Sequence, residues 1–365
     1  KVFLPDCSGL NRFIIKHSKA FVTIFLLLFL PAAYAQSHVP VYYKLDLAMP
    51  QDLPSIMATN KLRKDYDMAT THFVLVHDSI GSQKLKKMTD QIEKVDGVES
   101  VLSYSKFVGP QIPDFFVPEN IKGAFKEDGM QMIMINSKYV AATEEVNSQL
   151  SEISKIVKNY DSKSIITGEA AMTDDLITTA NVDFKVTSYI SIAAIFAIVM
   201  IIFRSLTVPV ALVGSTELAI FINEGVPYLT NVSIPFVAPT VIGCVQLGAT
   251  VDYAILMTSR FKEEIQNGHG RREAIQIAST TSDDSVIASS LVLFCATLGV
   301  ALISRVEIIS SICGMLARGA LISAVVTIFI LPSVLYVCEP IFAHTSLWWR
   351  TPKPQKKYRG LRKSV

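Results

Sequence analysis

The stretch GATVDYAILMTSR, Gly248–Arg260, places a carboxylate, Asp252, among apolar and small residues. The apolar run around it begins near Pro235 and continues to about residue 258. An α-helix rises ~1.5 Å per residue, so a run of this length covers the ~30 Å hydrocarbon core of a bilayer. The stretch therefore predicts a membrane-spanning helix that carries a charged side chain.

The rest of the chain is rich in similar runs. It has 365 residues, of which 50% are hydrophobic, and its mean hydropathy is +0.38, which is high for a soluble protein. Peptide groups in lipid have no water to bond, so such runs must be helical. We predict an α-helical membrane bundle of six transmembrane helices, the first at 18–36 and the others at 185–203, 207–223, 233–258, 284–304 and 308–337.

The first of these segments has a second interpretation. Ala20–Ala35, AFVTIFLLLFLPAAYA, is short, follows Arg12, Lys16 and Lys19, and ends in a sequence that resembles a signal-peptidase site. It is therefore either a retained helix or a cleaved signal. Both interpretations export the residues that follow.

The positions of Lys and Arg predict the orientation, because cytoplasmic loops are enriched in these residues. The last sixteen residues hold seven Lys or Arg and no acid. We predict a protein of the cell membrane with a cytoplasmic lead at 1–17, helix one at 18–36, an extracytoplasmic domain at 37–184, helices two to six at 185–343 and a basic cytoplasmic tail at 344–365.

Residues 37–184 have the pattern of a soluble α/β domain. THFVLVHD, VESVLSYS, GMQMIMINS and KSIITGEA are typical of strands. Between the first and second strands, and again between the third and fourth, lies a stretch with apolar residues at helical spacing. These residues are Leu85, Met88, Ile92 and Val95 in the first stretch and Val146, Leu150, Ile153 and Val157 in the second. Two strand–helix–strand units predict a ferredoxin-like fold.

Asp252 is the candidate functional residue. A charged aspartate at the bilayer centre costs ~2.5–3.5 kcal/mol, so we expect this side chain to be held away from water and to exchange a proton as the helices repack. A structural hydrogen bond to another helix is the alternative. Tyr253 is placed to donate to the carboxylate, and Gly248 and Ser259 lie on the same helical face, where small residues allow close helix packing.

Other charges fall in or near the spans. Glu217 and Arg318 fall near the middle of helices three and six, and we hypothesise an intramembrane ion pair between them. Asp283 and Asp284 are expected in the first turn of helix five, where acids suit the helix dipole.

The sequence carries no nucleotide-binding loop, nucleophile elbow or metal-ligand spacing, and its five cysteines show no CxxC pattern. The net charge of +2 gives no basis for nucleic-acid binding. We therefore expect no cofactor, no metal and no catalytic residues.

The stretches GATVDYAILMTSRFKEEIQNG, REAI, SSLVLFCATLGVALIS and ILPSVLYV together resemble the MMPL branch of the RND transporter superfamily, over nearly the whole chain. SecD and SecF are similar too, but Asp252 is followed by Tyr253 rather than by Ala-Asn, and helix five begins DDSVIASS, which favours MMPL.

The resemblance implies export of hydrophobic or amphiphilic molecules driven by the proton-motive force. It assigns the family's proton relay to Asp252 and Tyr253, and implies that the outer domain is porter-like. Glu217 and Arg318 match no feature of the family pattern.

A complete transporter of this kind has two six-helix halves, and this chain supplies one. The second half is expected in the same polypeptide, in a homodimer or in a separate subunit. The chain begins with Lys1 and ends in a basic tail, which favours the C-terminal half of a longer polypeptide. Two other functions stay open: a lipid-sensing or scaffolding membrane protein, and a SecD/SecF-like accessory of protein export.

Overall fold

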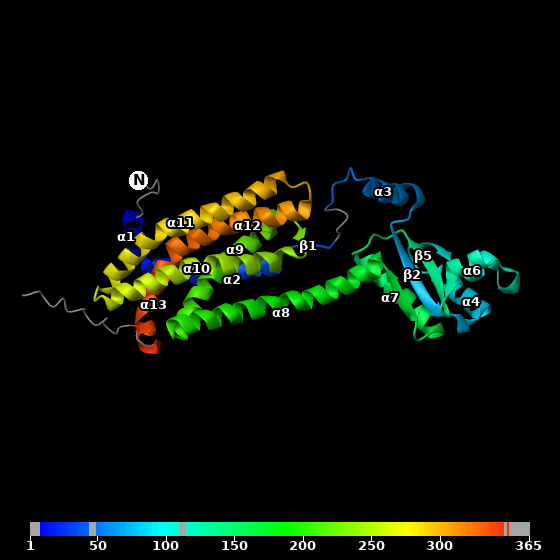
Figure 1. The fold of residues 1–365 in the computed structure, drawn as a ribbon, viewed down its shortest axis with the longest axis horizontal. Coiled ribbons are helices and arrows are strands. Elements are labelled where there is room, and N and C mark those ends of the chain that lie inside the picture. Colours follow the sequence, from blue (N-terminus) through cyan, green and yellow to red (C-terminus); the bar gives the residue numbers. More distant parts are fainter. Residues whose placement is uncertain (1–7, 44–48, 110–111, 113, 347–348, 350–365) are drawn as a thin grey trace, which may run out of the picture. The chain divides into compact units, whose positions relative to one another are not determined.

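The structure is a computed structural model that describes residues 8–43, 49–109, 112, 114–346 and 349. The chain forms two compact units (Figure 1). One unit comprises residues 1–42 and 184–365 and the other comprises 43–183. After the predictions above, we name them the membrane unit and the outer unit. Most of the predicted basic tail lies outside the described residues.

The membrane unit is made of long helices with one short parallel pairing, between β1, Val41–Tyr42, and β7, Ile234–Pro235. Its helices are α1, Ser8–Lys16; α2, Ser18–Ser37; the second part of α8, Glu169–Phe203; α9, Thr207–Thr230; α10, Ala238–Gln266; α11, Arg271–Ile303; α12, Glu307–Val325; a π-helical segment, Val326–Ile330; and α13, Leu331–Thr345.

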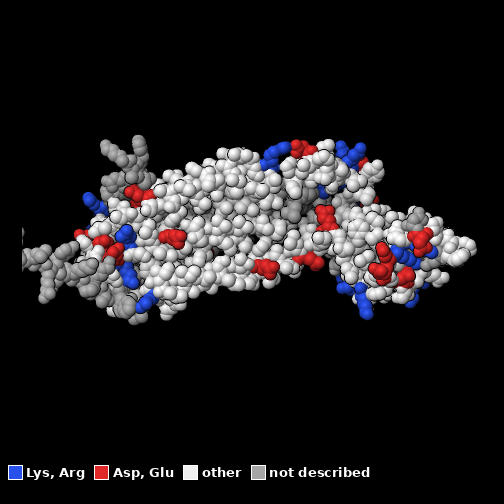
Figure 2. Space-filling view, in the orientation of Figure 1, with Lys and Arg blue, Asp and Glu red and all other residues white. Residues whose placement is uncertain are grey.

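Among the described residues, five helical segments are long and apolar enough to cross a membrane: Ser18–Ser37, Glu169–Phe203, Ala238–Gln266, Arg271–Ile303 and Glu307–Thr345. α9 is not one of these five, because Glu217, Asn223 and Glu224 lower its hydropathy. It nevertheless packs against α2, α10, α12 and α13. Figure 2 shows a mostly uncharged surface over these helices, with Lys and Arg near their ends.

Most of the spans differ from their predicted boundaries; α10, for example, covers Ala238–Gln266 rather than 233–258. α11 starts at Arg271 rather than near 284, so Asp283 and Asp284 lie twelve and thirteen residues into the helix. The expectation that they occupy its first turn is wrong, because the polar stretch before them continues the helix. α9 extends to Thr230, and the last span extends to Thr345.

The outer unit is built around an antiparallel sheet. In sheet order its longer strands are β3, Val98–Leu102; β5, Met130–Ser137; β2, Thr70–His77; and β6, Ile165–Gly168, and a short β4, Lys126–Glu127, pairs with β5. Its helices are α3, Pro54–Tyr66; α4, Ser82–Ile92; α5, Tyr104–Val108; α6, Glu119–Phe125; α7, Glu144–Tyr160; and the first part of α8. Short 3₁₀ turns lie at Asp78–Ile80 and Asp114–Phe116.

Alternation along β2 and β5 buries one face of this sheet. Val74, Val76, Ile133 and Ile135 are buried there, as period-two alternation requires. Residues of α4 and α7 complete the same cluster. The four predicted strands and the two predicted apolar helix faces are therefore present.

Candidate functional site

Asp252 lies in the middle of α10, and its side chain is exposed. The described helices of this chain therefore do not themselves hold the carboxylate away from its surroundings, and the expected shielding stays a prediction. The reason is its angular position: Val245, Gly248, Leu256 and Ser259 recur at three- and four-residue spacing with Asp252, and all of them are exposed. α10 thus presents one continuous face, here called the α10 face, that no described helix covers.

Tyr253 points elsewhere. Its ring packs against a cluster formed by Val286, Ala324 and Ile328 of α11, α12 and the π-helical segment. In the described chain no hydrogen bond joins its hydroxyl to Asp252. The two residues are therefore adjacent in sequence, but Tyr253 lies on the side of α10 that faces the bundle.

Gly248 and Ser259 do not mediate helix packing within the described chain. A Cβ added to Gly248 would have no neighbour within 4 Å, and Ser259 is exposed. Both residues belong to the α10 face and are free to contact another subunit or segment.

The hypothesised Glu217–Arg318 pair is wrong for this structure. Arg318 on α12 donates from Nε to Oδ1 of Asn223 at 2.8 Å and from Nη2 to the backbone oxygen of Asn223 at 2.9 Å. Asn223 is six residues beyond Glu217 on α9, which turns it to a different side of the helix. The position of Arg318 along the sequence does not show which side of α12 faces Glu217, so the sequence alone does not decide the pairing.

Asn223 and Arg318 belong to a polar network that joins three helices. Asn223 Nδ2 donates to Gln246 Oε1 of α10 at 2.8 Å and to the Met315 oxygen of α12 at 3.0 Å. Gln246 Nε2 in turn donates to Ser323 Oγ at 2.9 Å and to the Gly319 oxygen at 3.4 Å. Asn223, Gln246 and Ser323 are each no more than 2% exposed, so the network lies inside the bundle.

Gly319 makes this network possible. A Cβ at this position would lie 2.5 Å from Gln246 Oε1 and 2.6 Å from Asn223 Nδ2. Such distances are far below van der Waals contact, so only glycine lets the two amides approach the α12 backbone. We name Asn223, Gln246, Arg318, Gly319 and Ser323 the three-helix network.

Three buried acids were not singled out by the sequence analysis as functional. Glu224 on α9 is 2% exposed, Asp283 on α11 is 1% exposed and Glu339 on α13 is fully buried. Asp283 accepts a 2.7 Å hydrogen bond from Asn11 of α1, and Glu339 lies 3.7 Å from Nε of Arg271. Helical spacing carries a usable signal for Glu224, which follows Glu217 by seven residues and so shares its face.

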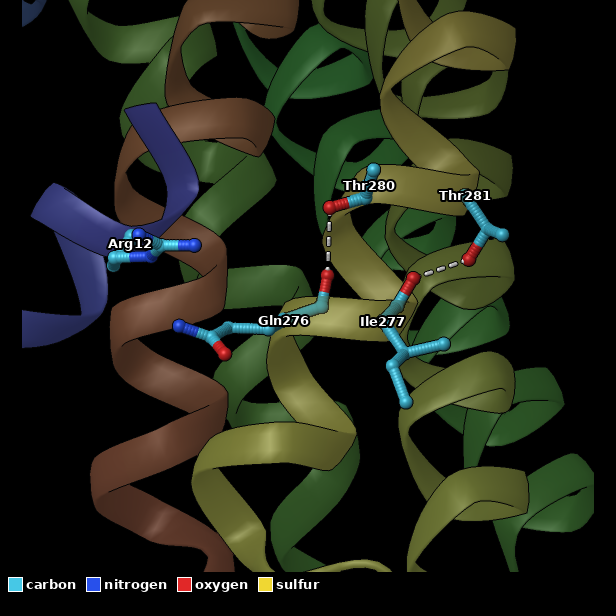
Figure 3. A pocket seen from close by; sticks show the side chains of 5 residues that line it. All are labelled: Arg12, Gln276, Ile277, Thr280 and Thr281. Atoms are coloured by element: carbon cyan, nitrogen blue, oxygen red, sulfur yellow. Dashed lines mark hydrogen bonds between the residues drawn. The ribbon is translucent and has the colours of Figure 1, made fainter. Parts of the chain in front are cut away.

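A pocket of about 320 Å³ lies between α1 and α11 (Figure 3). It is lined by Arg12 of α1 and by Gln276, Ile277, Thr280 and Thr281 of α11. The hydroxyls of both threonines donate to carbonyls one turn earlier in their own helix. None of the predicted site residues lines this pocket.

The site therefore contains an exposed carboxylate, Asp252, on an uncovered face of a candidate membrane helix, with a buried polar network in the same bundle. Within the described ranges no group of three His, Cys, Asp or Glu is arranged to hold a metal ion. The chemistry that this arrangement offers is the gain and loss of a proton at a carboxylate.

Comparison with known proteins identifies similar chains. The Bacillus subtilis (strain 168) putative membrane protein YdgH is 25% identical over 280 residues, covering 74% of this chain and 29% of its own length. The probable transport protein MmpL4 of Mycobacterium leprae (strain TN) is 24% identical, covering 58% of this chain and 22% of its own length. This chain thus spans under a third of these two relatives.

Two further matches concern transport. The trehalose monomycolate exporter MmpL3 of Mycolicibacterium smegmatis (strain ATCC 700084 / mc(2)155) is 25% identical, covering 29% of this chain and 10% of its own length. The crystal structure of a heavy metal efflux pump superposes with a TM-score of 0.55 at 9% identity, covering 92% of this chain and 49% of the pump. At that identity the superposition shows the fold alone.

The model of the MMPL family matches residues 48–362, which is most of the chain. The match includes α10 with Asp252 and the three-helix network. The chain is therefore a membrane protein that belongs to the MMPL family.

Proposed function

We propose that the chain is one half of an MMPL transporter that exports a hydrophobic or amphiphilic molecule in exchange for protons. The observation that carries the proposal is Asp252, an acid in the middle of a membrane helix on a face that its own bundle leaves uncovered. Membership of a family with named transport proteins supports export. A charge that moves inward across 100 mV gains ~2.3 kcal/mol, which is the driving force available per proton.

The second half is proposed to cover the α10 face. An aspartate in contact with lipid is costly, whereas one between two bundles can be hydrated and can lose its proton. This chain covers 49% of the efflux pump, as one of two halves would. Gly248 and Ser259 then provide the close approach that the described helices do not use.

We further propose α9 as the sixth span. Its 24 residues correspond to ~36 Å, enough to cross the hydrocarbon core. Its polar residues point into the bundle: Asn223 joins the three-helix network, and Glu224 bonds Gln36 of α2. The proposed topology keeps residues 37–184 outside and the C-terminus in the cytoplasm.

The outer unit is proposed to be a ferredoxin-like porter domain that receives and passes substrate. Numbered along the chain, its longer strands are ordered 2-3-1-4 and pair antiparallel. α4 and α7 each follow the first strand of a strand–helix–strand unit and contribute to the same core. This topology supports the assignment.

The proposal is tested by export of fluorescent lipids and amphiphiles from cells that carry the full-length protein. Asp252→Asn, which mimics a permanently neutral acid, should reduce export to the background of cells without the protein. Asp284→Asn, a change at an exposed acid of α11, is the matched control and should retain export. Export that survives Asp252→Asn at equal expression would contradict the proposal.

An uncoupler separates transport from the other two functions. A proton-driven exporter loses activity when the gradient collapses, whereas a lipid sensor or scaffold does not depend on it. A SecD/SecF-like accessory predicts accumulation of secretory precursors when the gene is deleted.

Burial of the α10 face is a separate measurement. A nitroxide at Ser259→Cys should collide with oxygen much less often in the assembled transporter than one at Val292→Cys, which is 70% exposed on α11. Equal collision rates at the two positions would mean that nothing covers the face.

A further inference from the structure

Glu224 is a buried carboxylate to which the proposed mechanism gives no role. Oε2 accepts a 2.9 Å hydrogen bond from Nε2 of Gln36, and Oε1 is buried without a hydrogen-bond partner in the described chain. We propose that Glu224 is a second proton-binding site of the protein, located where α2, α9 and α10 meet and separate from Asp252.

The polar residues next to Glu224 have no donor left for it. Both amide groups beside it, those of Asn223 and Gln246, already donate within the three-helix network. Each NH₂ group has two hydrogens and each makes two bonds there. Gln36 is thus the one side-chain donor that the described chain directs at Glu224.

One neutral donor is a poor environment for a charge. Ionised carboxylates buried in proteins are paired with cations or accept several hydrogen bonds, because desolvation otherwise costs several kcal/mol. Glu224 has neither a salt-bridge partner among the described residues nor a second donor. A bound proton removes this cost, so the surroundings favour the neutral acid.

The unbonded oxygen of Glu224 faces Gly243 of α10. A Cβ built on Gly243 would lie 3.6 Å from Oε1, an ordinary van der Waals distance. Because glycine has no polar side chain, α10 offers Oε1 no side-chain donor at this point.

The other charged and titratable groups on the packed helices do not replace the proton. Glu217 shares the face of Glu224 and has the same sign. Directly after α2, His38 stacks on Tyr34 and bonds its carbonyl oxygen. On α12, Arg318 is held by Asn223. On α10, Gly243 and Gln246 meet this part of α9, and neither carries a charge.

The position also gives the site a place in the proposed transport cycle. Gly243 precedes Asp252 by nine residues, which is ~14 Å along α10. In the proposed orientation, Glu224 lies nearer the outer surface than Asp252, and a proton that enters from outside reaches its level first. This role in the cycle rests on the proposed function, whereas proton binding at Glu224 does not.

Infrared difference spectroscopy of the full-length protein in lipid nanodiscs tests the inference. The acid-minus-alkaline spectrum should contain a carbonyl band of a protonated carboxyl group that is lost in Glu224→Gln. The band should persist in Asp252→Asn and in Glu217→Gln, the matched control on the same face. Gln36→Leu should keep the band but change its frequency, because the hydrogen bond to Oε2 is gone.

Two results would overturn the inference. One is a Glu224→Gln spectrum that matches the unchanged protein. The other is a band that disappears at constant pH when K⁺ is replaced by Na⁺, which would make Glu224 a cation site. If Glu224→Gln fails to fold, the frequency change in Gln36→Leu still assigns the band, and its absence overturns the inference.

The outcome is independent of the proposed function. A Glu224 band together with export that ignores an uncoupler would contradict proton-driven export and leave this site intact. Proton-driven export without the Glu224 band would contradict proton binding at Glu224 and leave the proposed function intact.

Discussion

The outer unit and the membrane unit bury amide side chains in different ways. In the outer unit, Gln149 of α7 accepts from His72 Nε2 of β2 at 3.1 Å and donates to the Asp96 backbone oxygen at 2.8 Å. In the membrane unit, Gln246 bonds side chains and backbone on two other helices. One glutamine joins a helix to a sheet and a loop, and the other joins helix to helix.

The difference shows what holds each unit together. The outer unit has water on its outside, so burial of apolar faces on α4, α7 and the sheet drives its packing. Helices in lipid have apolar surroundings on every side, so close contact and interhelical hydrogen bonds define the arrangement. We therefore expect changes in backbone approach to be severe in the membrane unit, and the loss of single hydrogen bonds to be milder there than in the outer unit.

The largest loss of stability is predicted for Gly319→Ala. The new Cβ would overlap Gln246 and Asn223 and separate α12 from α9 and α10, at a cost of about 3 kcal/mol or more, since both overpacking and unsatisfied amides contribute. Denaturation of the purified protein in mixed micelles measures this change in the free energy of unfolding. Gly314→Ala on the same helix, whose nearest neighbour is 4.0 Å away, should cost under about 0.5 kcal/mol. Similar losses for both variants would show that the network does not require close approach.

The second-largest loss of stability is predicted for Gln149→Leu in the outer unit. It leaves His72 and the Asp96 oxygen without their partner, which should cost about 1–3 kcal/mol. Hydrogen exchange of the β2 and β5 amides in the full-length protein reports the loss. Glu152→Gln, on the exposed side of α7, is the control that should leave exchange unchanged. Unchanged exchange in Gln149→Leu would mean that this bond does not stabilise the unit.

In the membrane unit, the hydrogen bond between Gln246 and Ser323 should contribute less to stability. A double-mutant cycle with Gln246→Leu and Ser323→Ala should give a coupling of about 0.6 kcal/mol, the average for interhelical hydrogen bonds in membranes. The lower value arises because the unfolded helices in lipid also find polar partners. A coupling above about 2 kcal/mol would reverse the comparison between the two units.

A small pH effect is expected on the stability of the outer unit. His72 is fully buried, and desolvation lowers the pKa of its imidazole although the bond to Gln149 opposes this. A lowered folded-state pKa favours the neutral ring, so its contribution to stability is complete well above pH ~6.5 and declines as the pH falls below that value. The hydrogen-exchange rates of the β2 amides, corrected for intrinsic rates, should therefore increase as the pH falls from 7 to 5.

Replacement of the histidine isolates this effect. His72→Gln should remove the pH-dependent part of the exchange. Asp161 does not contribute in this range, because the backbone and ring N–H groups of His77 lower the pKa of its carboxyl group and keep it ionised. A pH dependence that persists in His72→Gln would assign it to another group.

The apolar pattern predicted the elements well and the polar partners poorly. The strands of the outer unit and the faces of α4 and α7 follow from residue spacing, because one side of each faces water. In the membrane unit, a charge at the end of an apolar run was interpreted as the end of the span. Glu224 and Asp283 were thereby placed outside or at the edge of helices that in fact continue past them.

Depth and angle are separate quantities in a spanning helix. Sequence position shows how far along their helices Glu217 and Arg318 lie but not which helices are neighbours, so it does not reveal Asn223 as the partner of Arg318. The small residues around Asp252 are predicted to allow close helix packing. They lie on the α10 face, which no described helix of this chain covers and which the proposed function assigns to a second bundle.

Reciprocal coupling tests the central proposal most directly. In vesicles that contain the full-length protein and no imposed proton gradient, a gradient of an amphiphile identified in the export assay should drive protons the other way, because coupling between two ligands is mutual. We predict a substrate-dependent pH change inside the vesicles that is absent in Asp252→Asn and present in Asp284→Asn. Substrate movement with no pH change in the unmodified protein, or an unchanged pH signal in Asp252→Asn, would contradict proton exchange at Asp252.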